Sequence, residues 1–158
     1  MPITTPNANK IWELYTGKST QITGTGKCYL GFSSTKPNAD GSNFTEPDPA
    51  IYPSYARIQM NINEAMEWTD IWGAVAEGMV TNVKEFTSPE CKEESGWPTF
   101  THFGIFGQEE GGVPLATDFL TDPDGEPDED GIYPAKSLTV AKNHVAVFRV
   151  GTLQLKLV

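Results

Sequence analysis

The chain is poor in the residues that most often carry chemistry. It has two cysteines and two histidines among 158 residues. Cys28 and Cys91 each stand alone, outside any Cys-x-x-Cys spacing, so we expect both to be free thiols, one in a strand and one in a loop. Because the ligands of structural zinc normally arrive in close pairs, these scattered residues predict no zinc site.

Basic residues and long apolar runs are also scarce. Eleven lysines and arginines face 21 acidic residues, and the net charge of −10 opposes attraction to nucleic acid or to an anionic membrane. No run approaches the ~20 apolar residues of a membrane span, and no signal-peptide pattern opens the sequence. We therefore expect a soluble protein made in the cytoplasm, with neither nucleic acid nor membrane as a partner.

Repeats are missing as well. No unit of ~20–50 residues recurs, which argues against a propeller, a solenoid or a long fibre shaft. The length fits a single domain over residues 1–158.

Catalytic motifs are absent too: there is no Gly-x-Ser-x-Gly elbow, P-loop or dinucleotide fingerprint. His102 has only Thr99 and Thr101 as polar neighbours in its own segment, which favours a structural imidazole over an acid–base catalyst. His144, at a turn, is predicted to be exposed. We expect no catalytic, cofactor-binding or metal-binding residue, no cofactor and no enzymatic activity.

An acidic, proline-bearing stretch occupies residues 121–133 and is predicted to be a solvated surface loop. An EF-hand would need glycine at its sixth position, but that position is Pro127 when counted from Asp122 and Glu129 when counted from Asp124. A cation held in some other way, by residues 122–130 or by residues 40–46, stays open as an alternative.

Strand signals dominate what is present. Short segments rich in β-branched and aromatic residues alternate with turns of Gly, Pro, Asn and Asp, and no strand–helix–strand alternation appears. This pattern predicts an all-β fold, an antiparallel β-sandwich or jelly roll. The expected strands are 27–34, 55–62, 79–86, 99–106, 115–120, 144–150 and 152–158.

Two segments depart from the strand pattern. Residues 7–20 predict an N-terminal helix and linker, with Ile11, Leu14 and Tyr15 spaced along one helical face. Residues 63–78 could be a short helix or an ordered loop, because their tryptophans have helical spacing while their glycines oppose it.

Two of the expected strands carry sharper predictions. In residues 55–62, Ala56, Ile58, Met60 and Ile62 alternate with polar residues and should share a buried face. Residues 99–106 have apolar side chains at both parities, which is typical of a central strand covered on both faces.

Four tryptophans, at positions 12, 68, 72 and 97, allow two interpretations. Aromatic residues in a small β-domain are usually core or subunit interface. An exposed, shared surface of them would instead be a carbohydrate-binding platform.

Several segments in order resemble a family of small tailed-bacteriophage proteins, described as tail fibre or virion structural proteins. The resemblance covers most of residues 10–158. It is carried by "LYTGKST", "YLGFSSTKPNADGSNFTEP", the Tyr-Ala-Arg strand "SYARIQM", the Trp-x-x-x-Thr-His-Phe-Gly-Ile-Phe motif within "GMVTNVKEFTSPECKEESGWPTFTHFGIF", "GGVPLATDFL" and "VFRVGTLQLKLV". Pro98 stands where the family has glycine, and residues 63–78 and 121–133 are enlarged.

The resemblance implies a virion structural protein that acts by assembly. Its expected partners are further copies of itself, for example in a trimer, and other virion proteins such as the major capsid or tail proteins. Without shaft repeats, the chain suits an exterior capsid-decorating subunit, and a tail fibre or baseplate component, with or without carbohydrate binding, is the alternative. His102 is then a structural residue, and Gly104 allows a backbone or aromatic ring to approach closely.

Overall fold

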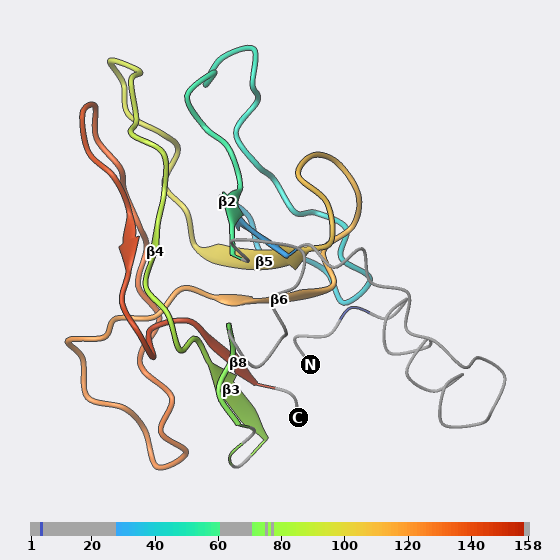
Figure 1. Ribbon diagram of the computed structural model, residues 1–158, viewed down its shortest axis with the longest axis vertical. Coiled ribbons are helices and arrows are strands. Elements are labelled where there is room, and N and C mark those ends of the chain that lie inside the picture. The colour runs from blue at the N-terminus through green and yellow to red at the C-terminus, as the bar shows by residue number, and fades with distance from the viewer. Residues whose placement is uncertain (1–3, 5–27, 61–70, 75, 77, 157–158) are drawn as a thin grey trace, which may run out of the picture.

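The computed structural model describes residues 4, 28–60, 71–74, 76 and 78–156, and this part of the chain is all-β, with strands and no helix. Its strands are short and antiparallel wherever they pair (Figure 1). They are β1 (Tyr29–Ser33), β2 (Ile58–Gln59), β3 (Met79–Thr81), β4 (Phe86–Thr87), β5 (His102–Phe106), β6 (Ala116–Phe119), β7 (Val147–Phe148) and β8 (Gln154–Lys156). Among the same residues, no helix is long and apolar enough to cross a membrane.

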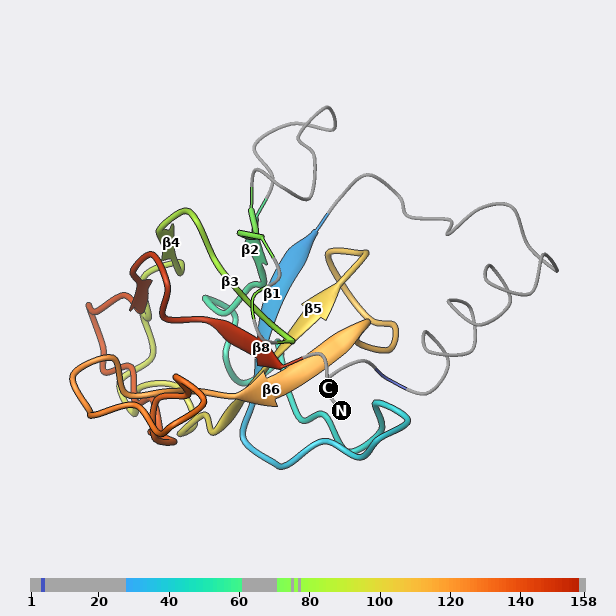
Figure 2. The same ribbon diagram turned by 90° about the horizontal axis from the view of Figure 1, so that it is seen from below.

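The main sheet has the strand order β2-β1-β5-β6 (Figure 2). Phe103 of β5 lies opposite Phe32 of β1 and Asp118 of β6, so these three side chains share one face of the sheet. His102 lies opposite Ser33 and Phe119, and these side chains share the other face. The register therefore separates Asp118 from His102 although the two strands are adjacent.

One face of this sheet packs onto the hydrophobic core. The side chains of Leu30, Phe32, Phe103 and Ile105 on this face are at most 1% exposed. Phe32 stacks on Phe148 of β7 with ring centroids 5.1 Å apart, which joins the sheet to the strand pair β4–β7. Burial of this apolar surface is the main stabilising contribution to the fold.

The opposite face is covered by the long connection between β1 and β2. Phe44 from this connection packs edge-on against Phe106, with ring centroids 5.2 Å apart. A Cβ atom added at Gly104 would lie 2.7 Å from the Phe44 ring, so only glycine admits this contact. The expectation that Gly104 allows an aromatic ring to approach is confirmed.

The remaining strands form two pairs, β3–β8 and β4–β7, along one long antiparallel ribbon. Between the two pairs, the fully buried Asn82 side chain accepts a hydrogen bond from the Leu153 N–H and donates to the carbonyls of Lys84 and Arg149. Gly151 lies in this irregular stretch with φ of 82°, as expected for a bend. β8 lies beside β6 and so brings the ribbon against the main sheet (Figures 1 and 2).

Most of the strand predictions are confirmed, with differences in length. β5 is a central strand, with residues 103–106 all buried, and the 121–131 segment is a surface loop. The expected strand 79–86 is divided into β3 and β4, because the Asn82 hydrogen bonds interrupt the ladder. The sandwich arrangement stays a prediction, and the helix expected in residues 7–20 lies outside the described residues.

The alternation predicted for residues 55–62 is wrong at its start. Ala56 is exposed and Arg57 is buried, whereas Ile58 and Met60 are buried as expected. The physical reason is that the Arg57 guanidinium pairs with Glu46 inside the protein, so the charged side chain, and not the alanine, faces inward.

Candidate functional site

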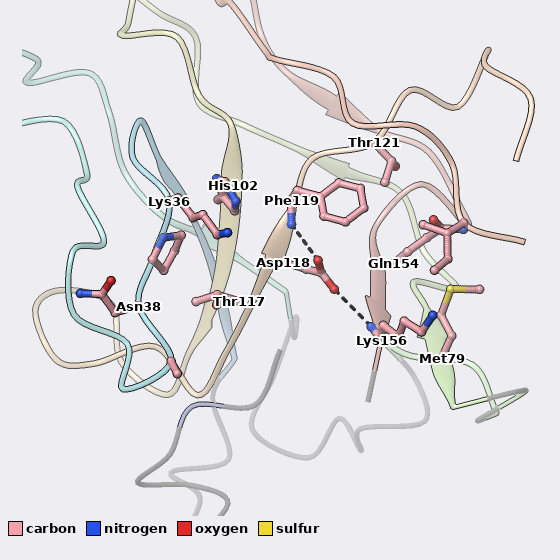
Figure 3. A pocket seen from close by; sticks show the side chains of 13 residues that line it. Lys36, Asn38, Met79, His102, Thr117, Asp118, Phe119, Thr121, Gln154 and Lys156 are labelled. Carbon is pink, nitrogen blue, oxygen red and sulfur yellow. Dashed lines mark hydrogen bonds between the residues drawn. The ribbon is translucent and has the colours of Figure 1, made fainter. Parts of the chain in front are cut away.

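A pocket of about 370 Å³ lies around the edge strand β6 (Figure 3). Its walls come from β5, β6 and β8, from the start of the β1–β2 connection and from residues near Ile132. Its size is within the range of small-ligand sites. The strand β6 divides the pocket into a β8 side and a β5 side, and the two sides are lined by different polar groups.

On the β8 side, the polar groups are used in internal hydrogen bonds. The Asp118 carboxylate accepts the N–H of Phe119 at 2.9 Å and the N–H of Lys156 at 3.2 Å (Figure 3). Gln154 accepts from the Tyr133 N–H and donates to the Gly131 carbonyl. These side chains therefore connect β6, β8 and the acidic loop, and they have a structural role.

Asp118 is the carboxylate among the residues that line this pocket. Burial raises the pKa of Asp118 above its usual range, while the N–H groups of Phe119 and Lys156 oppose the shift.

On the β5 side, the pocket presents donors. Lys36, His102 and Thr117 line it, and the Lys36 ammonium lies beside the His102 ring (Figure 3). Within the described part of the chain, neither the Lys36 ammonium nor the Thr117 hydroxyl forms a hydrogen bond or an ion pair. This side is therefore the part of the pocket that is able to bind a ligand.

His102 is half-buried at the start of β5. Its Nδ1 lies 2.8 Å from the Thr101 hydroxyl. Burial lowers the pKa of His102, and the nearby positive charge of Lys36 lowers it further. Both effects favour the neutral imidazole, and no carboxylate contacts it among the described residues.

The turn that carries Lys36 is held by its own hydrogen bonds. Asn43, at φ of 60°, donates from its side chain to the Lys36 carbonyl at 2.8 Å. The Thr35 hydroxyl binds Thr45, and the Thr45 N–H binds the Ser33 hydroxyl. These contacts fix the start of the β1–β2 connection beside the start of β5. Neither Lys36 nor Thr117 carries a signal of its own in the sequence, because only the sheet register and the folded-back β1–β2 connection bring them beside His102.

A second polar cluster surrounds Arg57 and is internally satisfied. Arg57 binds both carboxylate oxygens of Glu46, at 2.9 and 2.6 Å, and the carbonyls of Gln108 and Gly111. Its guanidinium carbon lies 3.3 Å from the centroid of the Phe106 ring, a cation–π contact. Arg57 therefore fastens the β1–β2 connection and the β5–β6 loop together. The Tyr-Ala-Arg motif pointed to this position, although the inward direction of the arginine was not predicted.

A third cluster centres on Glu93 and surrounds a tryptophan. Glu93 accepts hydrogen bonds from the Ser54 hydroxyl and backbone N–H, and its carboxylate also accepts the Trp97 indole N–H at 3.0 Å. The Ser54 hydrogen bond is the largest cause that lowers the pKa of Glu93, to about 2. Because each of these donors belongs to the protein itself, the hydrogen bonds of the Glu93 cluster stabilise the fold.

The tryptophans, the cysteines and His144 were also singled out from the sequence, and the structure places most of them. Trp72 and Trp97, the two tryptophans in the described residues, are 1% and 4% exposed and belong to the core, while Trp12 and Trp68 lie outside that part. Cys28 and Cys91 are buried thiols, one immediately before β1 and one in a loop, and they form no disulfide. His144 is exposed, as predicted.

The acidic loops hold their carboxylates apart. Asp40 accepts from the Ser42 N–H and hydroxyl, Asp122 pairs with Lys136, and Asp128 accepts backbone N–H groups of its own turn. In the described ranges, no three His, Cys, Asp or Glu residues are grouped as metal ligands would be.

The comparisons with known proteins give the family. No curated protein matches the sequence. The family model described as podophage GP4 fiber I protein gp80 matches residues 2–156, which is nearly the whole chain. The resemblance to bacteriophage fibre proteins is thereby supported, and the chain belongs to this family of podophage fibre proteins, which are components of the virion.

Proposed function

We propose that the chain is a tail-fibre subunit that acts by protein–protein assembly and has no catalytic activity of its own. The observation that carries this proposal is the match to a podophage fibre family over residues 2–156. The family description favours the tail-fibre alternative over the capsid-decorating role expected from the missing shaft repeats. A globular subunit that forms the end of a fibre, or that connects the fibre to another component, needs no shaft repeat.

The polar clusters support a non-enzymatic role. The carboxylates of Glu46, Glu93 and Asp118 are each engaged by internal donors. His102 contacts a threonine hydroxyl, with no carboxylate to orient it in the described part of the chain. The two buried tryptophans, Trp72 and Trp97, also disfavour an aromatic sugar platform at their positions.

Exposed valines support assembly between copies. Val145 and Val147 are 43% and 49% exposed on the β7 segment, while Ala146 and Phe148 between and beyond them are buried. Val83 and Val150 are exposed on the same ribbon. Several exposed apolar side chains along one ribbon of an acidic protein are a feature of interaction surfaces.

The experiment that tests the proposal is immunogold labelling of intact particles with antibodies against the purified chain. We expect label at the tail. Label spread over the shell would support the decoration role instead and would contradict the proposal. Light scattering of the purified chain, expected to give an oligomer such as a trimer, tests self-assembly separately.

A further inference from the structure

We propose that Lys36, His102 and Thr117 form a binding site for a small oxyanion, a phosphate or carboxylate group, on the β5 side of the pocket around β6. This site goes beyond the assembly role and does not depend on it. The proposal rests on the placement of three donors on one wall of one pocket.

The sheet register places two of the donors together. His102 and Thr117 both belong to the face of the sheet that lies opposite the core, because their cross-strand partners are Phe119 and Gly104. Gly104 carries no side chain, and the space beside it is filled by Phe44, which belongs to the same connection as Lys36. Phe44 therefore anchors the segment that brings the third donor over the sheet.

The donors are available to a ligand. The Thr101 hydroxyl occupies Nδ1 of His102, so Nε2 is the ring nitrogen left for a ligand, and it carries the proton in the tautomer whose Nδ1 accepts from Thr101. Lys36 adds a full positive charge and three N–H donors, and Thr117 adds a hydroxyl. Charge-assisted hydrogen bonds of this kind are the strong ones, and an oxyanion accepts them all.

The charge of the surroundings agrees with an anionic ligand. Of the titratable residues that line the pocket, Lys36, His102 and Lys156 are basic and Asp118 is acidic. Asp118 lies on the core-facing side of β6 and is occupied by backbone N–H groups, and the Lys156 ammonium reaches Asp130. The β5 side is thus positive in a chain whose net charge is −10.

Other pockets fit this ligand less well. The pocket beside Arg57 is lined by Glu46, Asp48, Glu109 and Glu110, and the guanidinium there is already bound by Glu46. The pocket near Pro53 is formed around Ser54 and Glu93, which bond to each other. The first of these pockets repels an oxyanion, and in the second the Lys92 ammonium shares the wall with Glu90 and Glu93. A further pocket contains Arg149 and Lys136 together with Asp124, and its Lys136 is already paired with Asp122.

The two histidines of the chain give a direct test by NMR. Imidazole resonances of the full chain are followed at pH 7 and constant ionic strength while inorganic phosphate, or in a second series acetate, replaces chloride. We expect the His102 signals to shift saturably and the His102 pKa to rise, because a bound anion stabilises the imidazolium. The exposed His144 is the internal reference and should not respond. The anion that binds more tightly identifies the preferred group.

Substitutions separate specific binding from general salt effects. We expect Lys36→Met to weaken binding about tenfold or more, and Thr117→Val to weaken it by a smaller factor. The matched control is Lys142→Met, since Lys142 is a lysine with a side chain 39% exposed that is paired with Glu94 away from the pocket, and it should leave binding unchanged. Circular dichroism checks that each variant is folded.

Three results would overturn the proposal. They are parallel, non-saturating shifts of both histidines, no response of His102 at high anion concentration, or undiminished binding in folded Lys36→Met. Because none of these variants touches the β7 valines, unchanged self-association in light scattering keeps this test distinct from the test of the fibre role.

Discussion

At the scale of single residues, Arg57 is expected to stabilise the fold because it forms a buried ion pair with Glu46. Its side chain is 3% exposed and pairs with a Glu46 side chain that is 23% exposed. We expect Arg57→Met to lower the free energy of unfolding by roughly 3 kcal/mol, because the Glu46 carboxylate loses its buried partner. Urea denaturation followed by tryptophan fluorescence measures the change.

The matched control is an ion pair at the surface. Lys142→Met removes the pair with Glu94, whose side chain is 86% exposed, and should cost less than about 1 kcal/mol. The double variant Arg57→Met with Glu46→Gln should regain part of the stability lost in the single variant. Equal losses in Arg57→Met and Lys142→Met would contradict the structural role assigned to Arg57.

Gly104 is the second residue with a prediction of its own. Gly104→Ala would place a methyl group 2.7 Å from the Phe44 ring, and we expect a loss of about 1–3 kcal/mol in unfolding free energy. Gly73→Ala is the control, because its added methyl would meet its nearest neighbour at an ordinary 3.4 Å. Partial recovery in Gly104→Ala with Phe44→Leu would identify the ring contact as the cause, and no recovery would exclude it.

At the scale of elements, the loop 88–97 is tied to Ser54 by Glu93. The pKa of Glu93 is lowered from 4.5 to about 2 in the folded protein. A carboxyl group with a lowered folded pKa stabilises the fold above its unfolded pKa, and this contribution is lost as pH falls from about 4.5 towards 2. We therefore expect the urea midpoint to fall over this range.

The comparison with Glu93→Gln isolates this contribution from other carboxyl groups, such as Asp40 and Asp122, whose pKa values are also lowered. The variant should be less stable at pH 6, and its midpoint should fall less steeply below pH 4.5. If both proteins show the same slope between pH 6 and pH 2, Glu93 is not a source of the acid sensitivity.

At the scale of the whole molecule, the exposed β7 valines predict how copies associate. Val147→Asp places a charge at a position that is 49% exposed, so the monomer should keep its stability while self-association weakens at least tenfold. Light scattering over a range of concentrations measures the mass. Ile51→Asp is the control, since Ile51 is 62% exposed and lies off the ribbon. Equal association of both variants and the parent chain would place the interface elsewhere.

Much of the β-structure was predictable because strands leave local signals. Apolar residues at both parities indicated that β5 is covered on both faces, and the core positions Phe103 and Ile105 follow from it. The failure at residues 56–57 has a specific cause: alternation assumes that charge faces water, and it cannot anticipate a carboxylate 11 residues away that neutralises Arg57 inside the protein. The interruption of 79–86 by Asn82 is likewise caused by partners in the distant 149–153 segment.

The sequence by itself determined the all-β class, the acidic charge, the family resemblance and the structural use of Gly104, since each of these depends on composition, local spacing or an ordered set of motifs. Only the tertiary structure decided which polar side chains are internally satisfied and which are available to a ligand. Lys36, His102 and Thr117 are far apart along the chain, and they share a wall because antiparallel register and a folded-back connection bring them together. Such long-range pairing depends on the packing of segments that are distant in the sequence, so no local pattern records it.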